Sequence, residues 1–176
     1  GKYLGLAAAL PARAEATACA VDTECAVASG QVCRTATSTC VFQVLPSDTI
    51  NDDLRAAMTA ANTGAGADVI VIGEANASID AGSEDVSLQF GSVNFVDATL
   101  GAFTFPIVIA PLTIETSATV NVLLDGTDAV RFFLVKNDAT LDAQASLTLK
   151  NLTLVNAASP RAGGSVIHVD GTATTT

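Results

Sequence analysis

The chain has 176 residues and a formal net charge of −10, with 18 acidic residues against 8 basic ones. This surplus of negative charge repels nucleic acids and anionic membranes, which excludes both as expected partners. Charged residues make up only 15% of the chain, and the 32 alanines and 21 threonines favour a β-rich extracellular protein over a helical cytosolic enzyme or a disordered acidic tail.

Residues 1–18 form an Ala-rich apolar arm. Its run Tyr3–Leu10, followed by Ala12-Arg13-Ala14, is typical of the rear part of a secretory signal. Eight apolar residues are too few to cross a bilayer, so we expect no membrane span here. An arm of this kind packs either on its own domain or on a sheet edge or groove of a neighbouring copy.

Residues 19–41 form a Cys module. It contains the four cysteines of the chain, Cys19, Cys25, Cys33 and Cys40. Their gaps are longer than the two to four residues that usually separate zinc ligands, so we expect two disulfides and no metal. The residues between them are too small to build a core, and covalent closure must supply the order. Three pairings remain open at this stage.

Residues 46–64 carry the pattern of a short amphipathic helix. Pro46-Ser47-Asp48 announces its start, and Asn62 with Gly64 closes its end. Leu54, Met58 and Ala61 share one face. We interpret this helix as a cap, since it could cover an apolar end and the strand edges beside it.

Residues 65–176 change to an alternation of period two. The expected strands are Val69–Ile72, Phe103–Ile109, Leu112–Ile114, Val120–Val122, Phe132–Val135, Leu147–Leu149, Leu152–Leu154 and Val166–Val169. No second helical pattern separates them, which leaves a sandwich, a barrel or a β-solenoid. Phe95, Ile114, Phe133 and Leu152 recur every 19 residues. This recurrence predicts a right-handed parallel β-helix with the four side chains stacked inward; the alternative is a β-sandwich or jelly roll.

Two stretches carry a resemblance to a known family. Leu54-Arg55-Ala56-Ala57-Met58, Ala61-Asn62 and Gly66-Ala67-Asp68 resemble the capping segment of secreted right-handed parallel β-helix proteins of the polymorphic outer-membrane and adhesin-like kind. The stretch from Asp125 to Ile167 is similar to their first coils. The capping segment departs from the family pattern in that Ala56 replaces the usual Glu and no Cys stands directly before Leu54. The resemblance implies a secreted surface protein with a capping helix.

Candidates for catalysis are few. Asp125 and Asp128, with Arg131 nearby, could serve a carbohydrate-active enzyme, but Asp125-Gly126 is a common turn signal and we interpret the group as structural. His168 lacks a second ligand or a nucleophile context and is interpreted as a strand surface residue. We therefore expect no catalytic residue, no cofactor and no metal. Asn76-Ala77-Ser78 and Asn151-Leu152-Thr153 are candidate glycan acceptor sequons.

The sequence as a whole predicts a secreted, cell-surface structural protein without enzymatic activity. An apolar arm at one end and an open last coil at the other predict self-association, with a head-to-tail fibre as product. The alternatives are an adhesin-like or carbohydrate-active domain of a larger secreted protein, with carbohydrate as partner.

Overall fold

The computed structural model describes residues 18–25, 30–63, 67–77, 84–90, 95–97, 100–118, 120–128, 130–138, 144–158, 166–170 and 174–175, and the statements below concern these residues. They contain one short 3-10 helix, η1 (Asp22–Glu24), and one α-helix, α1 (Ile50–Ala61). The strands are β1 (Gln31–Arg34), β2 (Thr39–Val44), β3 (Asp68–Ile72), β4 (Glu84–Gln89), β5 (Phe95–Asp97), β6 (Gly101–Phe103), β7 (Pro111–Thr116), β8 (Val120–Asp125), β9 (Phe133–Lys136), β10 (Ser146–Lys150), β11 (Leu152–Val155), β12 (Ile167–Asp170) and β13 (Thr174–Thr175).

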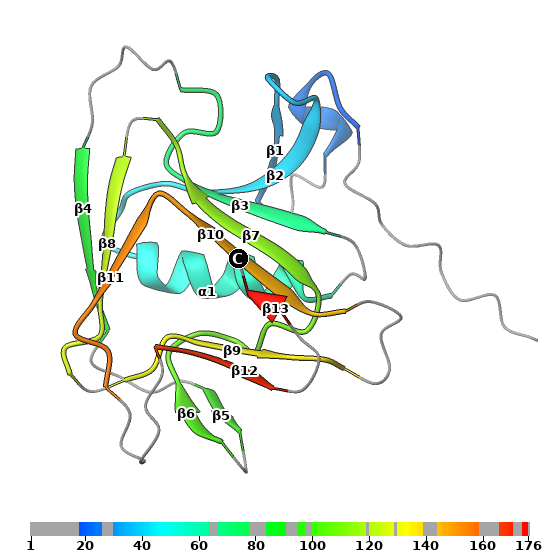
Figure 1. Cartoon of the computed structure of the whole chain (residues 1–176). Coiled ribbons are helices and arrows are strands. Elements are labelled where there is room, and N and C mark those ends of the chain that lie inside the picture. The colour runs from blue at the N-terminus through cyan, green and yellow to red at the C-terminus, as the bar shows by residue number, and fades with distance from the viewer. Residues whose placement is uncertain are drawn as a thin grey trace, which may run out of the picture.

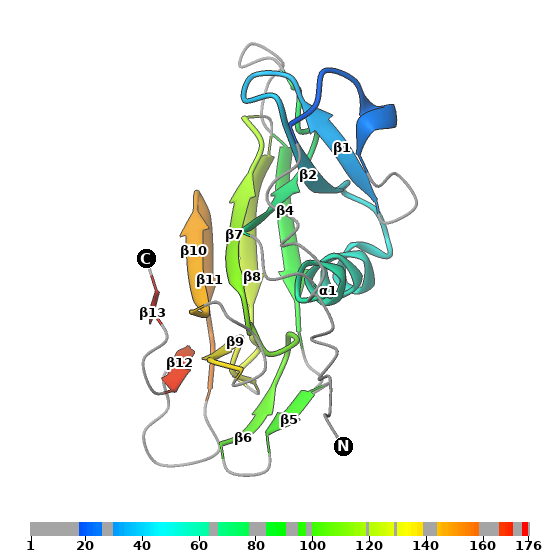
Figure 2. The same ribbon diagram turned by 90° about the vertical axis from the view of Figure 1, so that its right-hand side faces the viewer.

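The strands divide among four sheets. The largest has the order β1-β2-β3-β7-β10-β13, in which β1 and β2 are antiparallel and the other neighbours are parallel. A second sheet, β11-β8-β4, and a third, β12-β9, are parallel, while β5 and β6 form an antiparallel hairpin. Figure 1 shows the three sheets with parallel strands along three sides of the body, with α1 crossing between them in this view. In Figure 2, α1 lies on one side of the strands, and β10 to β13 lie on the other.

The expectation of a right-handed parallel β-helix is wrong. The structure is a mostly-β protein with several small parallel and mixed sheets and one helix. Its strand partners do not follow a 19-residue repeat, since Ile70 pairs with Ile114 and Ile114 with Leu149, at longer and unequal separations. The sandwich or jelly-roll alternative is also wrong, because most neighbouring strands are parallel.

The expected inward stack of four residues is wrong for the same reason. Phe95, Ile114, Phe133 and Leu152 belong to four different sheets. Apolar residues are so frequent in this chain that a regular spacing arises without a structural repeat. The residues that do stack are register partners on adjacent strands, such as Val86, Val122 and Leu152.

Most of the expected strands are confirmed, with small shifts of their ends. The expected strand Phe103–Ile109 is wrong, because β6 contains only its first residue. The backbone N–H groups of Thr104 and Phe105 still donate to the segment that leads into β9, and that of Val108 donates to Leu134 O in β9 itself. Pro106 lies between them and has no N–H to donate, so regular pairing does not continue.

The core lies between the three sheets with parallel strands and the inner face of α1. At its centre is a cluster of four wholly buried aromatic rings, Phe90, Phe105, Phe132 and Phe133. The Phe105 and Phe133 rings stack with centroids 4.8 Å apart, and the Phe90 ring meets Phe105 edge to face at 5.0 Å. These geometries are the favourable ones for aromatic pairs and fix the rings in one arrangement.

Helix α1 is confirmed at the predicted place. At its start, Thr49 Oγ1 donates to Asp53 at 2.9 Å, and its buried face consists of Ile50, Leu54, Ala57, Met58 and Ala61. Leu54 and Met58 are completely buried, one turn apart on that face. Burial of this apolar face, more than intrinsic propensity, stabilises a helix of this length.

Polar side chains of α1 and its end bind backbone groups of β4 and of the segment between β6 and β7. Asn62 Nδ2 donates to Ile107 O at 2.7 Å, and Asn62 Oδ1 accepts from Ile109 N at 3.2 Å. Arg55 Nε donates to Thr104 O at 3.2 Å, and Asn51 Nδ2 donates to Gln89 O at 3.3 Å. The helix therefore closes this end of the molecule by satisfying backbone groups as well as by covering the core.

Candidate functional site

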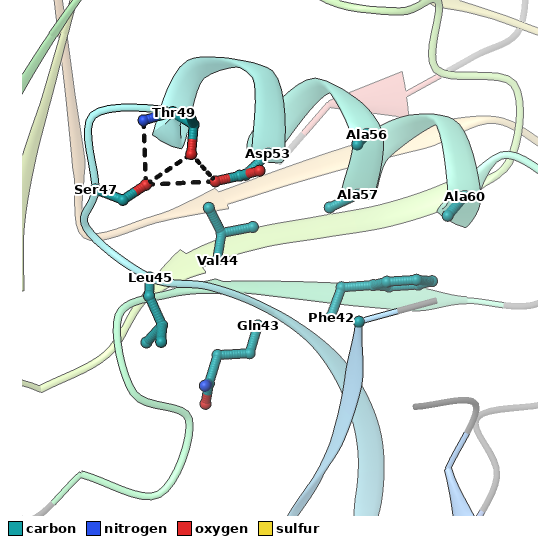
Figure 3. A pocket seen from close by; sticks show the side chains of 11 residues that line it. Phe42, Gln43, Val44, Leu45, Ser47, Thr49, Asp53, Ala56, Ala57 and Ala60 are labelled. Carbon is teal, nitrogen blue, oxygen red and sulfur yellow. Dashed lines mark hydrogen bonds between the residues drawn. The ribbon is translucent and has the colours of Figure 1, made fainter. Parts of the chain in front are cut away.

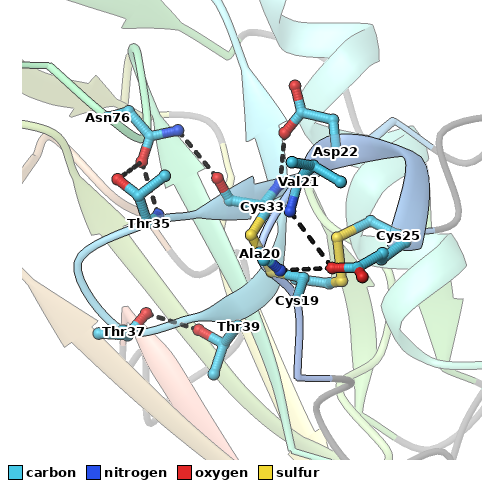
Figure 4. The surroundings of a disulfide bond; sticks show 12 residues. Cys19, Ala20, Val21, Asp22, Cys25, Cys33, Thr35, Thr37, Thr39 and Asn76 are labelled. Carbon is cyan, nitrogen blue, oxygen red and sulfur yellow. Dashed lines mark hydrogen bonds between the residues drawn. A yellow bond between two sulfur atoms is a disulfide. The ribbon is translucent and has the colours of Figure 1, made fainter.

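The Cys module contains two disulfides, as the sequence predicted. The pairs are Cys19–Cys33 and Cys25–Cys40, with Cα atoms 5.8 and 5.5 Å apart (Figure 4). Three of the sulfurs lie within 4.8 Å of one another, a spacing that suits a metal, but a disulfide sulfur has no thiolate to offer. The two bonds hold η1 against the β1–β2 hairpin and are compatible with an oxidising, extracellular compartment.

Asn76 fastens this module to the rest of the chain. Its Nδ2 donates to Cys33 O at 2.8 Å, and its Oδ1 accepts from Thr35 N at 2.8 Å (Figure 4). The side chain thus pairs with the edge of β1 as a neighbouring strand would. The first candidate sequon therefore has its acceptor nitrogen engaged in structure.

The second candidate sequon lies in a different environment. Asn151 occupies the turn between β10 and β11 with φ at 58°, a left-handed conformation that asparagine tolerates well. The residue is exposed, and Thr153 of the same sequon is exposed as well. Both acceptor residues are exposed, but among the described residues only the Asn76 side chain is bound to backbone groups.

A buried carboxylate makes a second connection between the module and the large sheet. Glu115 on β7 is 7% exposed and forms ion pairs with Arg34 of β1 and Lys150 of β10. Its Oε2 lies 3.3 Å from Lys150 Nζ. Because both cations retain contact with solvent, this group resembles a structural ion-pair network more than a catalytic acid.

The acidic turn at Asp125 has the structural geometry that the sequence suggested. Asp125 Oδ1 accepts from Thr127 N at 2.8 Å and from Asn156 Nδ2 at 3.0 Å, which is the geometry of an Asx turn. Asp128 is exposed with φ at 55°. Arg131 points elsewhere, stacking over the Phe103 ring at 4.3 Å and donating to Leu100 O. The three candidates do not converge on one site.

Lys136 forms ion pairs with two carboxylates on the outer face of β9 and β12. Its Nζ lies 3.3 Å from Asp97 Oδ2 and 3.6 Å from Asp170 Oδ2. The hydrogen bond to Asp97 is the main cause that raises the pKa of Lys136 above its ordinary value. His168 is half-buried on β12 in register with Leu134, as a strand residue. The ion pair between Asp97 of β5 and Lys136 of β9 connects the hairpin β5–β6 to the rest of the molecule.

An apolar groove of about 670 Å³ lies between β2 and α1. Phe42 and Val44 lie on the side of β2 that faces Ala57 and Ala60 (Figure 3). The one carboxylate in its lining is Asp53, which the helix start engages through Thr49 and Ser47. The groove offers apolar contact without a pair of groups for acid–base chemistry.

A polar depression of about 400 Å³ lies on the outer face of the sheet β4-β8-β11. Its lining includes Asp85, Ser87, Asn121, Leu123, Asn151 and Thr153. These side chains point outward because the alternate residues, Val86 and Val122 among them, pack toward the core. This depression gathers more exposed hydrogen-bonding groups than the groove at α1, and it is the better candidate binding site.

Asp68 is the carboxylate with the clearest change in acidity. It begins β3 on the same face as Ile70 and Ile72, which are both wholly buried. Its partial burial removes water from the carboxylate and raises its pKa to about 6. Asp68 lies apart from the polar depression, in register with the buried Leu112.

Comparison with known proteins gives no match to a family model, a curated protein or a solved structure. Among the described residues, no helix is long and apolar enough to cross a membrane.

Sequence reasoning missed the polar depression entirely. Its residues come from three strands that are far apart in the chain, and β4 was not among the expected strands. The signal was the alternation Asp85-Val86-Ser87-Leu88-Gln89, which has a polar residue at every second position. Sequence alone could not place that strand beside Asn121 and Thr153.

Proposed function

We propose that the chain is an extracellular, non-enzymatic structural protein that associates with copies of itself. The contact is made at the end of the molecule formed by β11, β12 and β10 with its two-residue partner β13, called here the open end. The two disulfides support the extracellular part of the proposal. The resemblance of the α1 segment to caps of secreted surface proteins agrees with it.

The observation that carries the proposal is the difference between the two ends of the three sheets with parallel strands. At one end, α1 buries its apolar face, and its polar side chains bind backbone groups of the segment between β6 and β7. At the other end, β11, β12 and β13 are the edge strands of their sheets within the described part of the chain. Unpaired strand edges favour the addition of further strands.

Half-buried apolar side chains accompany these edges. Leu149, Leu152, Leu154 and Ile167 pack against the core but keep part of their surface exposed. Covering them removes apolar surface from water, at about 25 cal/mol for each Å². A second copy that pairs with the edges would complete this side of the core.

Association should depend on salt in a direction that the net charge fixes. Copies with a formal charge of −10 repel one another, so low salt opposes assembly. Between about 0.01 M and 1 M salt the Debye length falls from about 30 Å to about 3 Å. The apolar contact is then no longer opposed, and assembly should strengthen. The apolar arm of residues 1–18 is also expected to contribute to self-association. Its residues 1–17 lie outside the described residues.

The test is light scattering after gel filtration, over about a hundredfold range of concentration. We expect the mass of the wild-type chain to rise with concentration. Leu154→Arg places a charge at the open end and should keep the chain monomeric. Thr153→Arg adds the same charge on the outer face and should still assemble as the wild type does. Circular dichroism verifies the fold of both variants. A wild-type chain that stays monomeric in high salt, or equal assembly by both variants, contradicts the proposal.

A second candidate function is an adhesin-like role in binding carbohydrate. The specific observation that favours it is the polar depression on the sheet β4-β8-β11. It lies on an outer face rather than at the open end, so both functions are compatible in one molecule.

A further inference from the structure

We infer that the polar depression binds a neutral, extended hexose oligosaccharide that runs across β4, β8 and β11. This inference rests on the carbohydrate-binding candidate function and assigns its site and ligand class. The strands are parallel and in register, so that each contributes side chains at equivalent positions.

Two rows of side chains cross the sheet. In the first row, Asp85 is the register partner of Asn121. Asn151 continues this row beside Asn121, because Asn151 directly precedes Leu152 and Leu152 is the register partner of Val122. In the second row, Leu123 lies between Ser87 and Thr153. Adjacent strands are about 4.8 Å apart, which is close to the repeat of an extended β-1,4-linked hexose chain.

The hydrogen-bonding capacity of the depression is largely unused within the part of the chain that the structure describes. Asn121 Nδ2 donates to Asp85 Oδ1 at 2.9 Å. The side chains of Ser87, Thr153 and Asn151 are exposed and make no hydrogen bond with the described part of the chain. Hydroxyl and amide groups both donate and accept, which is what sugar hydroxyls require.

An apolar residue lies at the centre of these polar groups. Leu123 is half-buried, flanked by the hydroxyl side chains of Ser87 and Thr153. A hexose ring has an apolar C–H face bordered by hydroxyls, so that face can lie on Leu123 while the hydroxyls reach the polar side chains. An apolar floor with a few convergent polar groups is the usual composition of a small-molecule site.

Charge selects the class of sugar. The only ionisable group among the six outward-facing residues is Asp85, an acid, and the chain as a whole carries −10. A uronate or sulfated sugar would be repelled both locally and at long range. A neutral chain keeps the hydrogen bonds without that repulsion.

The experiment is titration calorimetry with cellohexaose, on protein from a host that adds no N-glycan to Asn151. We expect saturable binding that Asn121→Ala weakens by about fivefold or more, since an amide that both donates and accepts is lost. Ser87→Ala with Thr153→Ala is a second variant that removes only hydroxyls and keeps Asn121. Thr113→Ala, on a strand of the large sheet, is the matched control and should bind as the wild type does.

The possible results separate the site from the function. Cellohexaose binding that all variants retain overturns this site and leaves a carbohydrate-binding function elsewhere on the chain. If cellohexaose, maltohexaose and mannohexaose all fail to bind, both the site and the candidate function are wrong. Tighter binding of an oligogalacturonate than of cellohexaose overturns the charge argument and with it the assignment of a neutral ligand.

Discussion

Replacing Asn62 by alanine tests how α1 closes its end of the molecule. The side chain makes two hydrogen bonds, one to Ile107 O and one from Ile109 N, and is half-buried. Alanine leaves one backbone acceptor and one backbone donor without partners in a partly buried place. Each lost bond costs about 0.5 to 1.5 kcal/mol, and a buried group left unsatisfied adds to this cost. We expect the free energy of unfolding to fall by about 2 kcal/mol.

The measurement is urea unfolding with the disulfides intact, together with thermal unfolding. For a domain of this size the expected loss corresponds to about 4 to 8 °C in Tm. Thr59→Ala is the matched control on the same helix, because Thr59 Oγ1 bonds only to Arg55 O on an exposed face. It should change the free energy by less than about 0.5 kcal/mol. A loss in Asn62→Ala no larger than in the control would refute the idea that side chains replace strand pairing at this end.

Three further predictions concern covalent structure and the ion pairs of the module. Peptide mapping without reduction should recover only the pairs Cys19–Cys33 and Cys25–Cys40, and any other pair would contradict the described hairpin. In a secretory host that adds N-glycans, mass spectrometry should find the glycan on Asn151 and not on Asn76, since a glycan on Asn76 competes with its bond to Cys33 O. Glu115→Ala should cost about 1 to 2 kcal/mol, more at low salt than at high salt, because two cations lose their partner; a loss that does not depend on salt would mean that packing, not charge, is responsible.

Local features could be predicted from the sequence because they depend on neighbouring residues. Helix α1 follows from its apolar face and its end signals, and the disulfides follow from cysteine spacing. The pairing of the cysteines did not follow, since it depends on how η1 lies against the β1–β2 hairpin. The short strands followed from alternation, but their partners did not.

The sheet arrangement could not be predicted, because it is set by connections of unequal length. Ile70 and Ile114 are partners across a long intervening segment that contains β4, β5 and β6. A fixed repeat would need equal connections, and the hairpin β5–β6 alone breaks that equality. Strand β4 was missed because its polar side chains face outward and its inward residues, such as Val86 and Leu88, form only a weak pattern.

The polar residues of α1 had a role that the sequence did not indicate. Asn62 was interpreted only as the end of a helix, and Arg55 only as part of a resemblance. In the structure both bind backbone groups of the segment between β6 and β7. Such roles depend on which segment lies opposite, and only the fold specifies that.

Asp68 should make the stability of the protein decrease as pH rises. Partial burial beside Ile70 raises its pKa from 3.8 to about 6 in the folded chain, so the folded state binds the proton more tightly than the unfolded state does. The stabilisation from this proton is fully present below about pH 4 and is lost as pH rises through about 6. Because the carboxylate retains contact with solvent, we discount the full linkage value to about 1 kcal/mol. In Asp68→Asn this loss is absent, so the variant should gain about 1 kcal/mol over the wild type between pH 4 and pH 7.5. Urea unfolding across this range measures the gain, and Asp48→Asn, which removes an exposed carboxylate, corrects for the change in net charge. A constant difference between Asp68→Asn and the wild type at all pH values would mean that burial does not perturb this group.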